Sequence, residues 1–184
     1  MNLTENILTT MGRASRDDIV AGASWYTDAH ALAGSLSADI TVGAGVIAAL
    51  SPQLSWVVNQ RQAIAAFRTG AASGCLGSSC RKADRIMAGE PALSVLGGDK
   101  VRNFYDNIVN PHGSSVAIDR HAWSIAMGFR SSNKDRSSLG RKGEYDRFAD
   151  AYRAAAGRLG ISPPTLQAIT WVTWRREAGL TWAG

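Results

Sequence analysis

The segment SVAIDRHAWSIAMG, residues 115–128, shapes our interpretation of the chain because its pattern changes from extended to helical at one carboxylate. Small and apolar residues lead into Asp119, and apolar residues at helical spacing follow it. Asp is a preferred N-cap residue, so the pattern predicts a helix that begins directly after Asp119. The positive end of the helix dipole favours an ionised carboxylate there. Two interpretations stay open: a structural cap, or a reactive carboxylate held at a helix start.

The rest of the sequence predicts an all-α protein. Apolar residues recur at helical spacing, prolines stand at turns or helix starts, and no segment alternates as a strand does. Besides the helix after Asp119, the predicted helices cover residues 17–36, 42–49, 54–67, 81–87, 92–96, 100–109, 145–159 and 165–178. We expect one compact domain over residues 1–184, with a frayed start at residues 1–14 and a basic loop at residues 130–142.

Several classes of protein are disfavoured by the sequence. The longest apolar run, residues 42–50, is too short to cross a bilayer, and the first residues lack the pattern of a signal peptide. We therefore expect no membrane partner and a location in the bacterial or host cytoplasm. The two cysteines, Cys75 and Cys80, are expected to be loop or buried thiols, since disulfides are rare in that compartment. Two thiols without a neighbouring histidine do not predict a metal site.

The charge of the chain is compatible with a polyanionic partner. The net charge is +5, and the 20 basic residues comprise 16 Arg and 4 Lys. Arginine forms forked hydrogen bonds with phosphate and stacks on bases, which favours nucleic acid. Ordinary solubility is the alternative explanation, because net charge reports on association and not on fold.

Four segments, in this order, resemble motifs of the helix-hairpin-helix DNA glycosylase superfamily, in particular its endonuclease III-like branch. They are VIAALSPQLSWVVNQRQA (46–63), RKADRI (81–86), ALSVLGGDKV (92–101) and VAIDRHAWSIAMG (116–128), with a weaker fifth, LQAITWVTWRR (166–176). The resemblance implies the helical glycosylase fold and DNA as the partner. The four-cysteine cluster loop of many relatives is absent, so no iron–sulfur cluster or other cofactor is expected.

The resemblance also implies two catalytic residues. Asp119 matches the family's catalytic Asp, which would stabilise positive charge at C1′ of an extruded nucleotide or align a water. Lys100 matches the lysine of lyase members and would attack C1′ as an amine. The alternative for Lys100 is an ordinary exposed lysine at a helix start.

Further residues are expected to contact DNA. Gln53 would fill the gap that an extruded base leaves in the stack; alternatively, its side chain bonds local backbone. The residues expected at the DNA are Gln53, Asn59, Gly97, Gly98, Arg120, His121, Arg130, Lys134, Arg136, Arg141 and Lys142. A stacking surface for the base is expected from Trp25, Tyr26, Trp56 and Trp123, although most tryptophans serve as core residues.

The sequence thus predicts a DNA N-glycosylase, a monomer acting in DNA repair, with lyase activity if Lys100 is a nucleophile. One alternative is a transferase of the bacteriophage type, which attaches amino acids or polyamines to hydroxymethylated thymine during DNA modification. That enzyme needs a small amine co-substrate. Another alternative is a DNA-binding module without catalysis, since the hairpin at residues 96–99 reads LGGD and lacks the family's proline.

Overall fold

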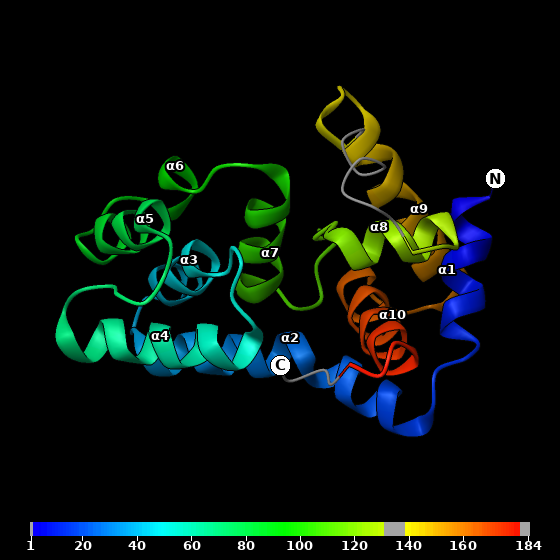
Figure 1. Ribbon diagram of the computed structural model, residues 1–184, viewed down its shortest axis with the longest axis horizontal. Coiled ribbons are helices and arrows are strands. Elements are labelled where there is room, and N and C mark those ends of the chain that lie inside the picture. Colours follow the sequence, from blue (N-terminus) through cyan, green and yellow to red (C-terminus); the bar gives the residue numbers. More distant parts are fainter. Residues whose placement is uncertain (1, 131–138, 181–184) are drawn as a thin grey trace. The chain divides into compact units, whose positions relative to one another are not determined.

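The computed structural model describes residues 2–130 and 139–180, and their regular structure is helical, as the sequence predicts (Figure 1). No strand occurs within these ranges. The helices are α1 (Leu3–Met11), α2 (Arg16–Leu36), α3 (Ile40–Leu50), α4 (Trp56–Thr69), α5 (Gly77–Met87), α6 (Ala92–Val95), α7 (Asp99–Val109), α8 (Arg120–Met127), α9 (Glu144–Leu159) and α10 (Pro163–Glu177).

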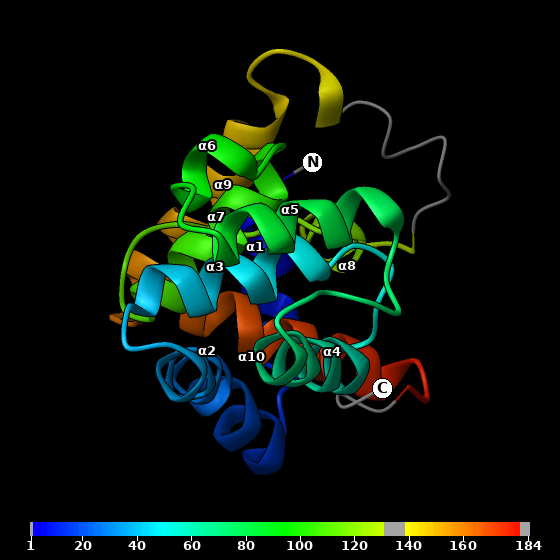
Figure 2. The ribbon, with the colours of Figure 1, turned by 90° about the vertical axis from the view of Figure 1, so that its left-hand side faces the viewer.

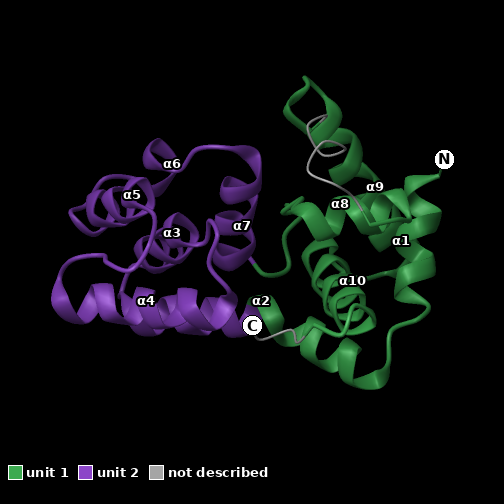
Figure 3. Cartoon of the chain, viewed as in Figure 1, with its two compact units in different colours: residues 1–26, 111–182 green, residues 27–110, 183–184 purple. Residues whose placement is uncertain are grey.

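The helices fall into two compact units, coloured separately in Figure 3. Unit 1 holds the chain up to Tyr26 and again from Pro111, and unit 2 holds Thr27–Asn110. The boundary in α2 falls between Tyr26 and Thr27. The sequence by itself predicts one domain. The second boundary, between Asn110 and Pro111, falls in the short turn containing Pro and Gly that follows α7.

Unit 2 is built around α3, whose residues from Gly43 to Leu50 are all buried. This helix is apolar on every side, and a helix of that kind is stable in water only when neighbours cover it all round. α4 lies along one side of α3, whereas α5, α6 and α7 cover the others (Figures 1 and 2). Asp39 caps the start of this helix, since its Oδ1 accepts a hydrogen bond from the Thr41 amide at 2.8 Å.

Unit 1 places α1, α8, α9 and α10 around a shared core. Its largest fully buried side chains include Tyr152 and Phe148 of α9, Ile125 of α8 and Leu166 of α10. The hydroxyl of Tyr152 donates to the carbonyl of Ala122 at 3.2 Å, so its one polar atom is satisfied inside the core. α8, which begins directly after Asp119, is therefore fixed by apolar contacts along its buried face.

The expected frayed start is wrong, because residues 3–11 form α1 and belong to the core. Leu3 and Ile7, four residues apart on one face of the helix, are buried. The side chain of Asn6 donates to the carbonyl of Ala126 at 2.8 Å, near the end of α8. The segment is too short and polar to predict a stable helix by itself, and its contacts with α8, α9 and α10 provide the missing stabilisation.

The expectation of free thiols is also wrong, since Cys75 and Cys80 form a disulfide with their Cα atoms 5.9 Å apart. The loop before α5 turns back onto that helix, because the Ala72 amide donates to the Asp84 carboxylate at 2.7 Å. This fold of the loop brings Cys75 next to Cys80 in the second turn of α5.

Gly22 allows α2 to approach α10 more closely than any side chain would. A Cβ at Gly22 would lie 2.4 Å from the Cα and 2.6 Å from the backbone nitrogen of Ile169. We expect Gly22→Ala to lower the free energy of unfolding by about 1–3 kcal/mol, because backbone atoms must move apart. Urea unfolding followed by circular dichroism measures this loss.

Gly157→Ala is the matched control for this prediction, since it also adds one methyl group to a helix of unit 1. Nothing lies within 4 Å of a Cβ at Gly157. Alanine should therefore leave stability unchanged or raise it by up to about 1 kcal/mol. Equal unfolding free energies for the two variants would contradict the close approach at Gly22.

Candidate active site

Asp119 caps α8, as the sequence predicts. Its Oδ1 accepts hydrogen bonds from the backbone amides of His121 at 2.8 Å and Ala122 at 2.7 Å. These amides belong to the first turn of the helix, where backbone N–H groups have no partner within the helix. The half-buried carboxylate is thus held at the positive end of α8.

The extended segment that leads into Asp119 is fixed from the other side by α9. Val116, Ala117 and Ile118 are buried, and the hydroxyl of Tyr145 bonds both ends of this segment. It accepts from the Ile118 amide at 3.0 Å and donates to the Val116 carbonyl at 2.9 Å. The backbone before the carboxylate is therefore as constrained as the helix after it.

Trp171 of α10 supplies the second contact of the carboxylate. Its indole Nε1–H donates to Oδ2 of Asp119 at 3.2 Å, so each carboxylate oxygen has at least one donor. The ring of His121 meets the Trp171 ring edge-on, with centroids 6.1 Å apart. The guanidinium of Arg175 lies 4.8 Å from the centroid of the same ring, a cation–π contact.

The sequence interpretation missed Trp171 and Arg175 as site residues. The only signal available was their spacing, since residues four apart share one face of a helix. Nothing in the sequence said that this face of α10 meets Asp119, which is 52 residues away in the chain. The predicted neighbours Arg120 and His121, in contrast, follow directly from adjacency to Asp119.

His121 is held in its neutral form by its surroundings. Burial lowers the pKa of its imidazole, and the guanidiniums of Arg120, Arg175 and Arg130 lower it further, while Asp119 acts in the opposite direction. Arg120 Nε donates to Nε2 of His121 at 3.2 Å, which requires that nitrogen to be an acceptor. The imidazole is thus a hydrogen-bond partner of Arg120 and not a further cation.

Two of the predicted stacking residues lie at this site. Trp25 is half-buried, 4.8 Å from Tyr26 and 6.4 Å from Trp171 between ring centroids. Tyr26 is buried, and its hydroxyl donates to Oε1 of Gln167 at 2.9 Å. Together with Trp171 these rings form an aromatic group from α2 and α10 beside Asp119. The burial of Tyr26 corrects the expectation that its ring faces a base.

The other two predicted stacking residues lie elsewhere. Trp123 is 3% exposed and belongs to the apolar core of unit 1, with its ring 5.8 Å from that of Phe148. The structure places this side chain in core contacts, which corrects the expectation that it faces a base. Trp56 is the first residue of α4 and lies in unit 2.

Lys100 and the predicted hairpin glycines belong to unit 2. Gly97 and Gly98 join α6 to α7, and Gly98 has a φ of +79°, a conformation that glycine adopts readily. Arg102 stabilises this turn, because its guanidinium donates to the carbonyls of Leu96 at 3.0 Å and Leu93 at 3.2 Å. Lys100 is exposed in the first turn of α7.

Gln53 and Asn59 differ in their accessibility. Gln53 is exposed between α3 and α4, with a φ of +65°, and no other non-glycine residue in the described ranges has a positive φ. Such a conformation is costly and tends to occur at functional sites. Asn59 is 2% exposed, and its Nδ2 donates to the Ile47 carbonyl at 3.1 Å. Asn59 therefore connects α4 to α3, which corrects the expectation of a DNA contact.

The predicted basic loop is described only at its ends. Arg130 is exposed and lies 5.4 Å from the centroid of the Trp174 ring. Arg141 and Lys142 are exposed just before α9. Lys134 and Arg136 lie outside the described residues, so their predicted roles are untested by the structure.

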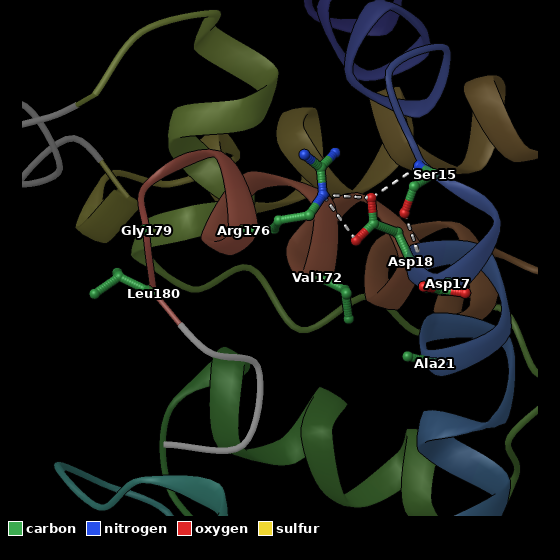
Figure 4. A pocket seen from close by; sticks show the side chains of 8 residues that line it. All are labelled: Ser15, Asp17, Asp18, Ala21, Val172, Arg176, Gly179 and Leu180. Atoms are coloured by element: carbon green, nitrogen blue, oxygen red, sulfur yellow. Dashed lines mark hydrogen bonds and ion pairs between the residues drawn. The ribbon is translucent and has the colours of Figure 1, made fainter.

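A separate cavity of about 440 Å³ lies between the start of α2 and the end of α10, with Asp18 and Arg176 in its lining (Figure 4). Asp18 and Ser15 form a capping box, in which each backbone amide donates to the other's side chain at 2.8–3.1 Å. Arg176 Nε donates to both oxygens of Asp18 at 3.1 and 2.9 Å. Asp18 is only 4% exposed, and its contacts assign it to stabilising the fold.

No group of three or more His, Cys, Asp or Glu side chains within residues 2–130 and 139–180 could hold a metal ion. No single helix in these ranges combines the length and apolarity needed to cross a membrane.

The fold and site define an all-helical protein with a carboxylate fixed at the start of one helix by a tryptophan from another. The chain belongs to DUF7178, a family of unknown function, which it matches over residues 1–178. No curated protein and no solved structure matches the chain.

Asp18 provides a test of stability against pH. Burial opposes its ionisation, but the hydrogen bonds from Ser15 and Arg176 outweigh burial and lower its pKa. This stabilisation is complete above the pKa of an unfolded Asp, about 3.9, and is lost as pH falls through the lower folded value. We expect Asp18→Asn to cost about 1–3 kcal/mol at neutral pH.

Urea unfolding of the wild type and Asp18→Asn at neutral pH and in strong acid checks this expectation, because the difference should shrink in acid. Asp17→Asn is the control, because Asp17 directly precedes Asp18 in the chain and is exposed. It should change the free energy of unfolding by less than about 0.5 kcal/mol. A difference for Asp18→Asn that is the same at both pH values would show that its charge does not stabilise the fold.

Proposed function

We propose that the protein is a DNA base-processing enzyme, an N-glycosylase in which Asp119 acts at the glycosidic bond of an extruded nucleotide. One observation carries the proposal: both oxygens of Asp119 are held by donors, one by backbone amides and one by Trp171. The resemblance of residues 116–128 to the catalytic block of helix-hairpin-helix glycosylases supports the same role.

The fixed orientation of the Asp119 carboxylate suits the stabilisation of positive charge on the sugar. A carboxylate whose orientation is fixed before the substrate arrives needs no reorganisation as positive charge develops at C1′. In the proposed reaction the C1′–N bond breaks, the base leaves with a proton, and water adds to C1′. Asp119 would stabilise the developing cation or align that water. A carboxylate already held by neutral N–H donors stays available for both tasks.

The aromatic group beside Asp119 supports the extruded-base interpretation. A base that leaves the stack loses contacts with its neighbours, and rings of Trp and Tyr can replace them. Trp25 is half-buried rather than enclosed, and Trp171 is partly accessible as well. Exposed Gln53, with its costly backbone conformation, remains the candidate for filling the vacated position in the duplex.

The lyase step through Lys100 remains a prediction. Lys100 is exposed in the first turn of α7, a place where a positive charge is unfavourable. In that step its neutral amine would attack C1′ and displace the base, forming a Schiff base after the sugar ring opens.

A transferase is the second candidate because three arginines lie near His121, two residues after Asp119 in the chain. Arg120, Arg130 and Arg175 all lie close enough to His121 to lower its pKa. Such a group suits an anionic leaving group, as in the transfer of an amine to an activated hydroxymethyl base. That reaction leaves the glycosidic bond intact and consumes a small amine.

Nucleoside mass spectrometry on duplex DNA incubated with the protein distinguishes these functions. The duplexes should carry normal, uracil, hydroxymethyluracil, alkylated or oxidised bases. We expect release of a free base by the wild type and a fall of about 10²–10⁴-fold in Asp119→Asn, which keeps the side-chain shape and loses the charge. Asp17→Asn is the charge-matched control and should retain activity.

Each other outcome points to a different function. A heavier nucleoside, formed from hydroxymethylated DNA and an amine, would replace the glycosylase with the transferase. Salt-dependent DNA binding without any product would indicate a binding module. If a base is released, borohydride trapping that is lost in Lys100→Ala would establish the lyase step.

Trp171→Phe tests whether the indole positions Asp119. Phenylalanine keeps an aromatic ring and removes the N–H donor. Loss of a hydrogen bond to a charged group costs about 1.5–3 kcal/mol, so we expect kcat for base release to fall by about 10–100-fold. KM for the duplex and Tm should change little. A change in KM or Tm with kcat preserved would show that Trp171 serves substrate stacking or stability instead.

A further inference from the structure

The group Arg120, Arg175, Arg130 and His121, here called the arginine cluster, has more positive charge than the proposed excision needs. Arg120 bonds His121, His121 contacts the Trp171 ring, and Arg175 lies over that same ring. Successive contacts thus connect Arg120 to Arg175 through two rings. Arg130, which follows Phe129 in the chain, lies beside the ring of Trp174 in α10.

Positive charges predominate among the groups that act on His121. Of the charged groups that act on His121, three are guanidiniums and one is the Asp119 carboxylate. Burial, and then the charge of Arg120, lower the pKa of Arg175, while Asp119 only partly compensates. Like charges held close together in a half-buried site favour the binding of an anion between them.

The arginines are held in a way that suits forked binding of an anion. The Trp171 ring supports Arg175 at 4.8 Å, which orients the plane of its guanidinium. Arg120 uses its Nε–H on His121, and its terminal nitrogens make no hydrogen bond with any described residue. An arginine oriented by its neighbours loses little entropy when it forms parallel bonds to a phosphate.

We propose that Arg120 and Arg175, flanked by His121 and Arg130, bind a phosphate-class anion next to Asp119. A cationic ligand does not fit between these arginines, because three guanidiniums would repel it. Phosphate carries the charge and the paired oxygens that guanidiniums recognise.

The phosphate could come from two sources. One is the DNA backbone beside the extruded nucleotide, an assignment that rests on the proposed function. The other is a phosphate or diphosphate on a small co-substrate or leaving group. The binding of the anion itself depends on neither, so it can be measured without any catalytic step.

Isothermal titration calorimetry with inorganic pyrophosphate tests the site in the intact protein. We expect Arg120→Gln and Arg175→Gln each to weaken binding by about tenfold or more, the loss of one charge-assisted contact. Arg68→Gln removes an exposed arginine of α4 and should leave the dissociation constant within about twofold. Circular dichroism melts confirm that the variants are folded; Arg120 is exposed, so its variant should fold even if Arg175→Gln does not.

A second titration, in the presence of saturating duplex DNA, identifies the source. Competition between duplex and pyrophosphate would assign the site to the DNA backbone, whereas simultaneous binding would assign it to a small phosphorylated molecule. Either result supports the anion site. No pyrophosphate binding up to about 1 mM, or equal affinity in the wild type and both cluster variants, would overturn it. If the protein releases no base in the nucleoside assay, only the proposed glycosylase activity is contradicted. The pyrophosphate titration still decides whether the anion site exists.

Discussion

The hydrogen bonds that Asp119 accepts from the first turn of α8 are the constraint on which the site of unit 1 depends. A helix start leaves backbone N–H groups without partners, and a carboxylate satisfies them while being held in place by them. Here the second oxygen of the same carboxylate reaches Trp171 of α10. One side chain therefore terminates a helix, connects two helices and presents a charge at the positive end of a dipole.

The comparison of Asp119 with Asp18 separates a candidate catalytic carboxylate from a structural one. Both carboxylates lie at helix starts in unit 1, Asp119 as the N-cap of α8 and Asp18 in the first turn of α2, and each has a guanidinium nearby. Asp18 is almost fully buried, and its two oxygens are taken up by Ser15 and by a direct ion pair with Arg176. Asp119 is half-buried among aromatic rings, with N–H groups of neutral donors on its oxygens. The difference lies in the accessibility of the two carboxylates and in their hydrogen-bond partners.

Close approach of helices is the second physical feature of the structure. Gly22 lets α2 approach the backbone of Ile169, and Gly43 lets α3 approach the carbonyl of Ala33 in the same way, since a Cβ there would lie 2.2 Å from that oxygen. Each glycine weakens its own helix by up to about 1 kcal/mol relative to alanine. The closer packing of neighbouring side chains compensates for that loss.

The sequence by itself determined the all-helical class, most helix positions and the cap at Asp119, because periodicity and capping act over a few residues. It missed α1, whose stability comes from burying Leu3 and Ile7 against other helices, and it missed the disulfide, which depends on how a loop turns back. Only the tertiary structure decided which indole contacts Asp119 and that Asn59 and Trp123 are buried. It also decided that Arg175 of α10 lies over the ring that His121 of α8 contacts. These contacts join residues far apart in the chain, and the packing of whole helices, which no local pattern encodes, selects them.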